Sequence, residues 1–259
     1  MISSARPPRG LPTSADRPRG PRAAALSAGV LLTVGVLSGC GSGASSTSGA
    51  TTPAGSSTPA SNTNGIEKLA PGAAAAKARA AFKTAPAVRV KGEVTESGEV
   101  ISFDSRITAA GGRTTMKQQG QSVDVLFTKG AIYMSGDLAF WKGITGSPAS
   151  ATTMVGKYLK ISPSSTQAKD LLGFVDRAEL ADNMLPGAND GFTSGTVTST
   201  SAGQRVFALS DGQGAYDVAL EGEPYPVRMS GPGVTMEFSY GGTVDLTPPP
   251  ASKVTVVRK

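Results

Sequence analysis

Residues 101–107 read Ile101-Ser102-Phe103-Asp104-Ser105-Arg106-Ile107, with apolar or small side chains at odd positions and polar or charged ones at even positions. Successive side chains of a β-strand point to opposite faces, so this period of two predicts a strand with one apolar and one wet face. Residues 88–91 and 123–127 alternate similarly, and residues 131–135 form a shorter apolar run. Glycines separate these segments, which therefore predict about five strands joined as antiparallel hairpins.

Helical spacing appears on both sides of these strands. An alanine-rich run from Ala73 to Lys83 predicts a helix that stops ahead of Pro86, because proline cannot continue a helix. Four further short helices are expected, and strand alternation then returns in four segments. The expected helices lie at 137–142, 149–155, 166–177 and 179–184, and the strands at 204–209, 215–220, 225–230 and 234–240. This order predicts one α+β domain over residues 66–259, an antiparallel sheet covered by segregated helices.

The beginning of the chain is typical of a secretory signal. Five arginines precede residue 23 against one acid, Asp16, and the 14 residues at 23–36 are uncharged. This stretch is too short for a transmembrane helix, which needs about 20 residues. Leu37-Ser38-Gly39-Cys40 follows directly and resembles the lipobox of bacterial lipoproteins. The resemblance implies that residues 1–39 are removed and that acyl chains on Cys40 anchor the protein at the outer face of the cell membrane.

Residues 41–65 are uncharged and consist mainly of Ser, Thr, Gly, Ala and Pro. Such a composition buries too little apolar surface to offset chain entropy, so residues 40–65 are expected to be the lipidated cysteine and a disordered tether. The formal charge of +6 comes mostly from the signal, since removing its five arginines and one aspartate leaves 20 basic and 18 acidic residues. The remaining +2 gives no support to a nucleic-acid partner.

The chain contains no histidine, and its one cysteine is Cys40. These facts exclude Ser-His-Asp and Cys-His catalysis and nearly all zinc, copper and haem sites. Asp211 and Asp217 lie among turn glycines, where a solvated structural role is expected. The carboxylates and amides at 182, 183, 189 and 190 lack the EF-hand spacing for calcium. The sequence therefore predicts a protein that is not an enzyme and uses no metal or cofactor.

Two groups of motifs resemble the LppX/LprG family of actinobacterial lipoproteins. The first comprises Ile132-Tyr133-Met134, Phe140-Trp141 and Gly156-Lys157-Tyr158-Leu159-Lys160; the second comprises Phe238-Ser239-Tyr240-Gly241, Val244, Pro248-Pro249-Pro250-Ala251 and Val254. The resemblance covers roughly residues 75–257. It implies a LolA/LolB-like fold, in which helices close the concave side of a strongly curved antiparallel sheet, or half-barrel. It also implies an apolar cavity that holds the acyl chains of a lipid or glycolipid, outward transport from the cytoplasmic membrane, and an export transporter as a possible partner.

The apolar positions allow two interpretations. Four methionines fall in expected strands, and their thin, adaptable side chains suit an acyl-chain cavity but also an ordinary core. Phe140 and Trp141 suit either the mouth of a cavity or helix-on-sheet packing. The expected cavity lining is Val90, Val94, Ile101, Phe103, Ile107, Met116, Val123, Val125, Phe127, Met134, Phe140, Trp141, Leu171, Leu172, Met229 and Met236. The alternative is an envelope interaction or sensor module whose core is filled.

Overall fold

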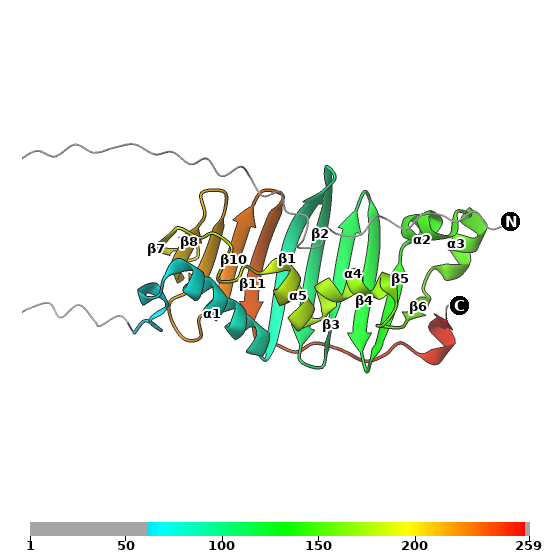
Figure 1. Cartoon of the computed structure of the whole chain (residues 1–259). Helices are drawn as coiled ribbons and strands as arrows, with labels where there is room; N and C mark the ends of the chain where they lie inside the picture. Colours follow the sequence, from blue (N-terminus) through cyan, green and yellow to red (C-terminus); the bar gives the residue numbers. More distant parts are fainter. Residues whose placement is uncertain (1–61, 257–259) are drawn as a thin grey trace, which may run out of the picture. The chain divides into compact units, whose positions relative to one another are not determined.

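The computed structural model describes residues 62–256, so the predicted signal peptide, Cys40 and most of the predicted tether lie outside the described residues. The described part is an α+β structure with one large, open, mostly antiparallel sheet and five α-helices (Figure 1). The strands are β1 (Ala87–Glu96), β2 (Glu99–Thr108), β3 (Gly111–Gln118), β4 (Gln121–Thr128), β5 (Ala131–Gly136), β6 (Tyr158–Ile161), β7 (Ser194–Ser199), β8 (Arg205–Ser210), β9 (Ala215–Ala219), β10 (Pro226–Gly231), β11 (Val234–Tyr240) and β12 (Val254–Val256). The helices are α1 (Pro71–Thr84), α2 (Leu138–Thr145), α3 (Pro148–Met154), α4 (Thr166–Val175) and α5 (Arg177–Met184). None of the helices within residues 62–256 is long and apolar enough to cross a membrane.

The chain enters the sheet at β1 in its middle, runs to one edge, and then returns to the middle from the opposite edge. Strands β1 to β6 follow one another across the sheet, and the chain then passes through α4 and α5 to β7, the opposite edge. Strands β8 to β11 return until β11 pairs with β1, with Val90 opposite Phe238. The two antiparallel halves are therefore joined at β1 and β11, which are far apart in the sequence.

Residues 241–253 lead from the middle of the sheet to its other edge. They connect β11 to β12, which pairs in parallel with β6, with Val254 opposite Tyr158. This path crosses seven strand spacings, about 34 Å, and the 14 steps from Tyr240 to Val254 reach at most about 48 Å. The segment therefore uses most of its maximum reach, and Figure 1 shows it in orange to red along the lower ends of β2 to β5.

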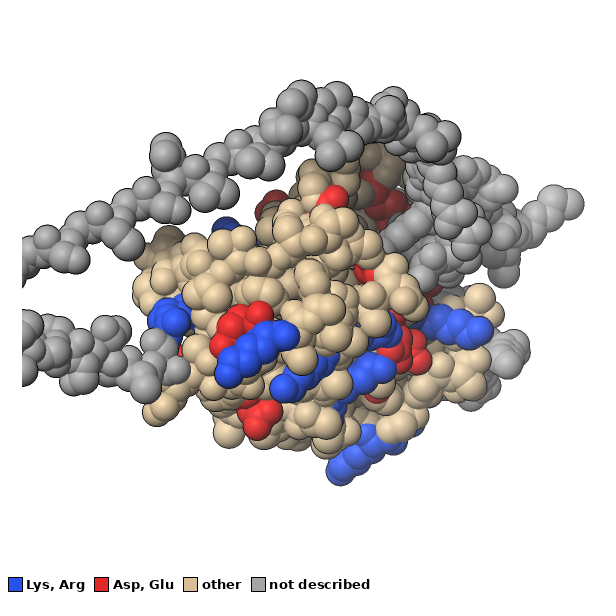
Figure 2. Space-filling model, turned by 60° about the vertical axis from the view of Figure 1, so that its left-hand side comes forward, with Lys and Arg blue, Asp and Glu red and all other residues tan. Residues whose placement is uncertain are grey.

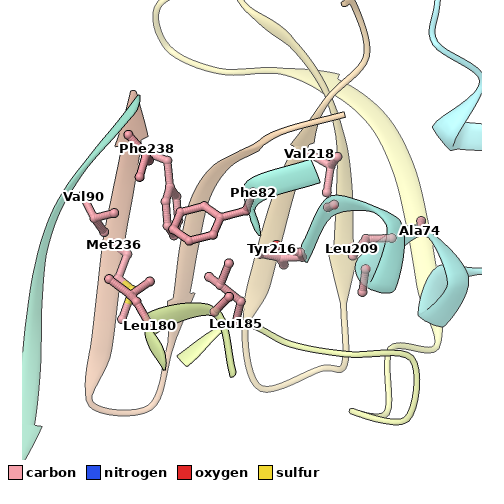
Figure 3. Close-up of a cluster of buried hydrophobic side chains, with 14 of the residues drawn as sticks. Ala74, Phe82, Val90, Leu180, Leu185, Leu209, Tyr216, Val218, Met236 and Phe238 are labelled. Atoms are coloured by element: carbon pink, nitrogen blue, oxygen red, sulfur yellow. The ribbon is translucent and has the colours of Figure 1, made fainter. Parts of the chain in front are cut away.

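Helices α1, α4 and α5 pack on one face of the sheet. Phe82 of α1 meets Phe238 of β11 edge to face at 5.9 Å, and Phe174 of α4 meets Phe103 of β2 at 5.1 Å. Figure 3 shows side chains of α1 and α5 converging on those of β9 and β11 in this layer. Gly112 of β3 allows a close approach of α4, because a Cβ there would lie 2.3 Å from the carbonyl oxygen of Val175.

The order of elements agrees with the sequence-based prediction, and three strands were missed. The expected helices correspond to α1 to α5, and the expected alternating segments correspond to β1, β2, β4, β5 and β8 to β11. Strand β3, between the glycines at 111–112 and Gly120, completes the five expected hairpin strands. Of the missed strands, β7 is exposed along its whole length and β6 has only four residues. The third, β12, depends on the long connection from β11. None of these strands produces an apolar alternation that is long enough to detect.

The described part of the chain begins a few residues before residue 66, the expected start of the domain. The backbone N–H of Asn64 donates to the carbonyl oxygen of Leu220 at 2.7 Å, and its side-chain amide donates to the carbonyl oxygen of Ala219 at 2.9 Å. Residues assigned to the tether therefore already pack on the sheet, because Asn64 caps backbone groups at the end of β9. A polar side chain can do this without the apolar pattern on which the boundary was based.

Candidate functional site

The candidate site is the helix-facing side of the sheet. The strand register makes many of the predicted cavity-lining residues direct neighbours on this side. Val94 is opposite Ile101, and Val125 is opposite Met134. Met116 is opposite both Phe103 and Val123. On the other half of the sheet, Met229 is opposite Met236. The residues that share this side are Val90, Val94, Ile101, Phe103, Ile107, Met116, Val123, Val125, Phe127, Met134, Met229 and Met236.

Burial divides these residues into two zones. Val90, Ile107 and Val125 are 0% exposed and lie beneath the helices with Phe103, Met134 and Met236. The second zone is a set of half-buried apolar residues that we call the apolar strip: Val94, Ile101, Met116, Val123, Met229 and Val234. Val234, Val94 and Ile101 are neighbours at one level of the sheet, and buried Met236 and Phe103 lie between Met229 and Met116 at the next. Most of the strip lies near the hairpin turns at 97–98, 119–120 and 232–233, and Figure 1 shows these hairpin tips extending beyond α4 and α5.

Helix α2 closes one end of the apolar strip. The carboxylate of Asp137 caps this helix by accepting the N–H of Phe140 at 2.7 Å, and it also accepts the N–H of Ser122 in β4 at 2.8 Å. The ring of Phe140 lies over Gly136, where a Cβ would be 2.2 Å from the ring, and Gly136 is the partner of Val123. The Asp137 cap therefore fixes Phe140 beside the strip, and the absence of a side chain at Gly136 leaves room for its ring.

The predicted helix residues lie in the same layer at different depths. Trp141 is 1% exposed and packs edge to face on Phe140 with 5.0 Å between ring centroids. Leu171 and Leu172 of α4 are half-buried against Val125 and its neighbours. The indole N–H of Trp141 and the hydroxyl of Tyr216 are buried without a hydrogen-bond partner among residues 62–256.

An acidic pair lies near the same hairpin tips. Glu96 is the last residue of β1, next to the turn at 97–98. Partial burial, together with the nearby carboxylate of Asp170 in α4, raises the pKa of Glu96 above its ordinary value of 4.5. The rim between β1 and α4 is therefore unfavourable for an additional negative charge.

The opposite face of the sheet is polar and holds an open hollow of about 990 Å³ over β1, β2, β3, β10 and β11. Lys91, Asp104, Arg106 and Arg113 are among its lining residues, and Thr243 to Asp245 of the connecting segment complete it. Arg89 holds Asp104 through two hydrogen bonds, and this pairing lowers the pKa of Asp104. Charged walls do not favour acyl chains, so this hollow does not correspond to the predicted cavity.

Asp217 corrects one sequence-based expectation. It was expected to be solvated in a turn, but it lies in β9, is 2% exposed and pairs with Arg228 at 3.0 Å. Asp211 takes the expected structural role, since its carboxylate accepts the N–H groups of Gln213 and Gly214, both at 2.8 Å. The turn glycines are close to Asp217 in sequence but do not determine its environment, because the strand pairing with β10 brings Arg228 over it.

Asp182 and Asp190, two of the possible oxygen ligands for calcium, each bind a different part of the protein. Asp182 is bound by Arg79 and Lys83, which lower its pKa, and Asp190 accepts the N–H of Gly187 at 2.7 Å. Over residues 62–256 the structure brings together no group of three or more Asp, Glu, His or Cys side chains that could hold a metal ion. Charged residues on the side of the molecule in Figure 2 are likewise of mixed sign and interspersed among uncharged ones.

Sequence reasoning missed part of the helix-facing side. Val234 belongs to the apolar strip as the partner of Val94, and Phe238, Tyr216 and Leu209 form much of the core under α1 and α5. Their alternation in 204–240 was recognised as strands, but nothing in the sequence places β11 beside β1. This pairing brings the residues of the second half of the sheet next to those of the first.

Comparisons with known proteins do not identify a family. No family model matches the chain, and no curated protein matches it. Among solved structures, one similar chain is described as an uncharacterized conserved protein from Thermus thermophilus. It shares 11% sequence identity, covers 69% of this chain and 95% of its own length, and has a TM-score of 0.32. The resemblance to the LppX/LprG lipoproteins therefore stays a prediction from the sequence.

Proposed function

We propose that this protein is an exported, membrane-anchored lipoprotein that binds the acyl chains of a lipid or glycolipid at the apolar strip and carries them outward from the cytoplasmic membrane. The single observation that carries the proposal is the apolar strip itself. Six aliphatic or thioether side chains lie on the helix-facing side near the hairpin tips, and each is only partly covered. Each methylene group that such a surface removes from water contributes about 0.8 kcal/mol.

The chemistry of the strip suits acyl chains better than a polar ligand. Its members offer shape and no directional bonds, and Met116 and Met229 adapt readily to an irregular apolar surface. The unpartnered indole N–H of Trp141 lies in the neighbouring apolar cluster, where an ester or hydroxyl oxygen of a bound lipid would relieve a cost of about 1–3 kcal/mol. We further propose that the sheet is strongly curved, as a half-barrel, with the helices on its concave side.

A second function is favoured by the buried zone. Val90, Ile107 and Val125 are fully buried, so the space beneath α4 and α5 is occupied by protein side chains. If protein side chains also cover the strip, no space for a lipid remains. The protein would then be an envelope interaction or sensor module with a filled core. The two functions differ in whether the purified protein carries lipid.

The test measures lipid that remains bound to the full chain carrying Cys40→Ser, which removes the predicted acylation site. Lipid extracted from the purified protein is quantified by mass spectrometry. A glutamate in the strip, Ile101→Glu, should lower the bound lipid at least about tenfold, because a buried charge opposes apolar binding. Val197→Glu is the matched control, since Val197 is 47% exposed on edge strand β7, away from the strip.

The result distinguishes the two functions. A parent protein without lipid, or an Ile101→Glu protein that retains the parental amount, would contradict the carrier function and favour the interaction module. The anchor is tested separately in the exporting host. There the unsubstituted chain should be labelled by a radioactive fatty acid, and Cys40→Ser should abolish the label. Persistent labelling of Cys40→Ser would show that the lipobox interpretation is wrong.

A further inference from the structure

Exposed apolar side chains also lie on α2, which adjoins one end of the strip, and at the C-cap of α3. Five large apolar side chains in residues 62–256 are strongly exposed, and three of them fall within 18 residues of sequence. They are Leu138 at 44%, Ile144 at 43% and Val155 at 48% exposure. Scattered single exposures are ordinary, whereas a group on one pair of packed helices indicates a contact surface.

The fold holds these side chains in place. Trp141, the buried residue of α2, fixes this helix against the sheet, and the Asp137 cap ties its first turn to β4. At 100° per residue, Leu138 and Ile144 flank Trp141 by about 60° on either side. The apolar arc of α2 is therefore wider than the part that the sheet buries.

Apart from Asp137, whose carboxylate accepts two backbone N–H groups, the charged residues of this region are lysines. From residue 138 to residue 169 the sequence contains four lysines and no Asp or Glu. Two of these lysines, Lys142 on α2 and Lys157 just before β6, are exposed. Lys160 of β6 is opposite Tyr133, lies over its ring and faces the other side of the sheet. None of the ion pairs among residues 62–256 includes these lysines. Exposed apolar residues with unpaired lysines complement an anionic bilayer surface, where the side chains enter the interface and the ammonium groups meet lipid phosphates.

The position of the two helices agrees with contact at a membrane. Asn62 follows the predicted acylation site, Cys40, by 22 residues, and Asn64 is bound to the end of β9. Helices α2 and α3 lie beyond β4 and β5, and seven strand spacings, about 34 Å along the sheet, separate β5 from β9. A contact there would be a second point of attachment, far from where the chain enters the sheet.

We propose that the surface formed by Leu138, Ile144, Val155, Lys142 and Lys157 docks on an anionic lipid bilayer. This docking goes beyond the proposed lipid binding, since it uses a different surface and needs no lipid in the strip. It would hold the anchored protein with the β5 end of the sheet against the membrane. An acidic protein partner is the main competitor for the same surface.

The chain provides its own probe, because Trp141 is the only tryptophan and lies on α2. The full chain with Cys40→Ser is mixed with vesicles that carry brominated acyl chains, which quench tryptophan fluorescence at short range. Vesicles of phosphatidylcholine and phosphatidylglycerol in equal amounts should quench Trp141, and vesicles of phosphatidylcholine alone should not. Ile144→Asn and Lys142→Gln should each weaken the apparent vesicle affinity at least about fivefold, and Val197→Asn should leave it unchanged.

Three results would overturn the proposal: no quenching by either vesicle, equal quenching by both, or quenching that is the same in Ile144→Asn as in the parent. The first would favour a protein partner. The melting temperature of each variant is measured alongside, and if Ile144→Asn is unfolded, Lys157→Gln replaces it in the comparison. Ile101→Glu separates the two proposals, because it should lose bound lipid and keep the quenching of Trp141.

Discussion

Replacing Val125 with tryptophan tests whether the buried zone of the helix-facing side is a packed core or a lipid space. The sequence-based prediction placed this residue in the cavity lining. In the structure Val125 is 0% exposed, and its register partners Thr114 and Met134 are 1% and 9% exposed. It packs in one cluster with Val175, the last residue of α4.

The expected cost follows from this packing. An indole in place of an isopropyl group adds several heavy atoms to a layer in which α4 already lies against the backbone at Gly112. Overpacking of this kind costs about 1–3 kcal/mol. For a protein of this size each kcal/mol shifts the melting temperature by about 2–4 °C, so Val125→Trp should melt roughly 2–12 °C below the parent.

Ile101→Trp is the comparison at the apolar strip. Ile101 lies on the same side of the sheet but is half-buried beside a hairpin turn. The larger side chain can extend past the helices there, so the destabilisation should stay below about 1 kcal/mol, while bound lipid should fall. Lys117→Trp, on the polar face of β3, is the control and should change neither quantity.

The assay combines urea unfolding, followed by circular dichroism, with mass spectrometry of bound lipid. Unchanged slopes of the unfolding free energy against urea would allow the midpoints to be compared directly. A Val125→Trp protein as stable as the parent, but without its lipid, would refute the packed-core reasoning. The space beneath α4 would then have to be open to ligand.

Three further predictions concern single contacts and can be checked by the same unfolding assay. Gly112→Ala should lose about 1–3 kcal/mol because its Cβ would overlap the carbonyl oxygen of Val175; Gly143→Ala, whose Cβ has room, should not destabilise the protein. The pKa of Asp104 is lowered by Arg89, so the pair's stabilisation is complete above the ordinary value of 3.8 and is lost as the pH falls through the lowered pKa. Asp104→Asn should therefore flatten the loss of stability between about pH 6 and about pH 2. The pKa of Glu96 is raised from 4.5, so its ionisation opposes folding, and Glu96→Gln should be more stable than the parent at neutral pH; equal stability there would contradict the desolvation argument.

The local pattern of the sequence determined most of the secondary structure. The alternation at 101–107 predicts which side chains share a face, and the register confirms it, since Ile101, Phe103 and Ile107 all lie on the helix-facing side. Alanine-rich spacing ahead of Pro86 likewise predicted α1. These predictions hold because side-chain direction in a strand or helix is fixed by local geometry, whatever the rest of the chain does.

Only the tertiary structure decided how deeply each of these residues is buried. Ile101 and Val125 have the same alternation and similar side chains, yet Ile101 is partly exposed and Val125 is fully covered. The difference arises because α4 crosses the sheet over β2 to β4 and stops short of the hairpin tips. Asp217 became a buried partner of Arg228 through strand pairing. Periodicity specifies the face on which a side chain lies, whereas its cover comes from elements distant in sequence, whose positions depend on the packing of the whole sheet.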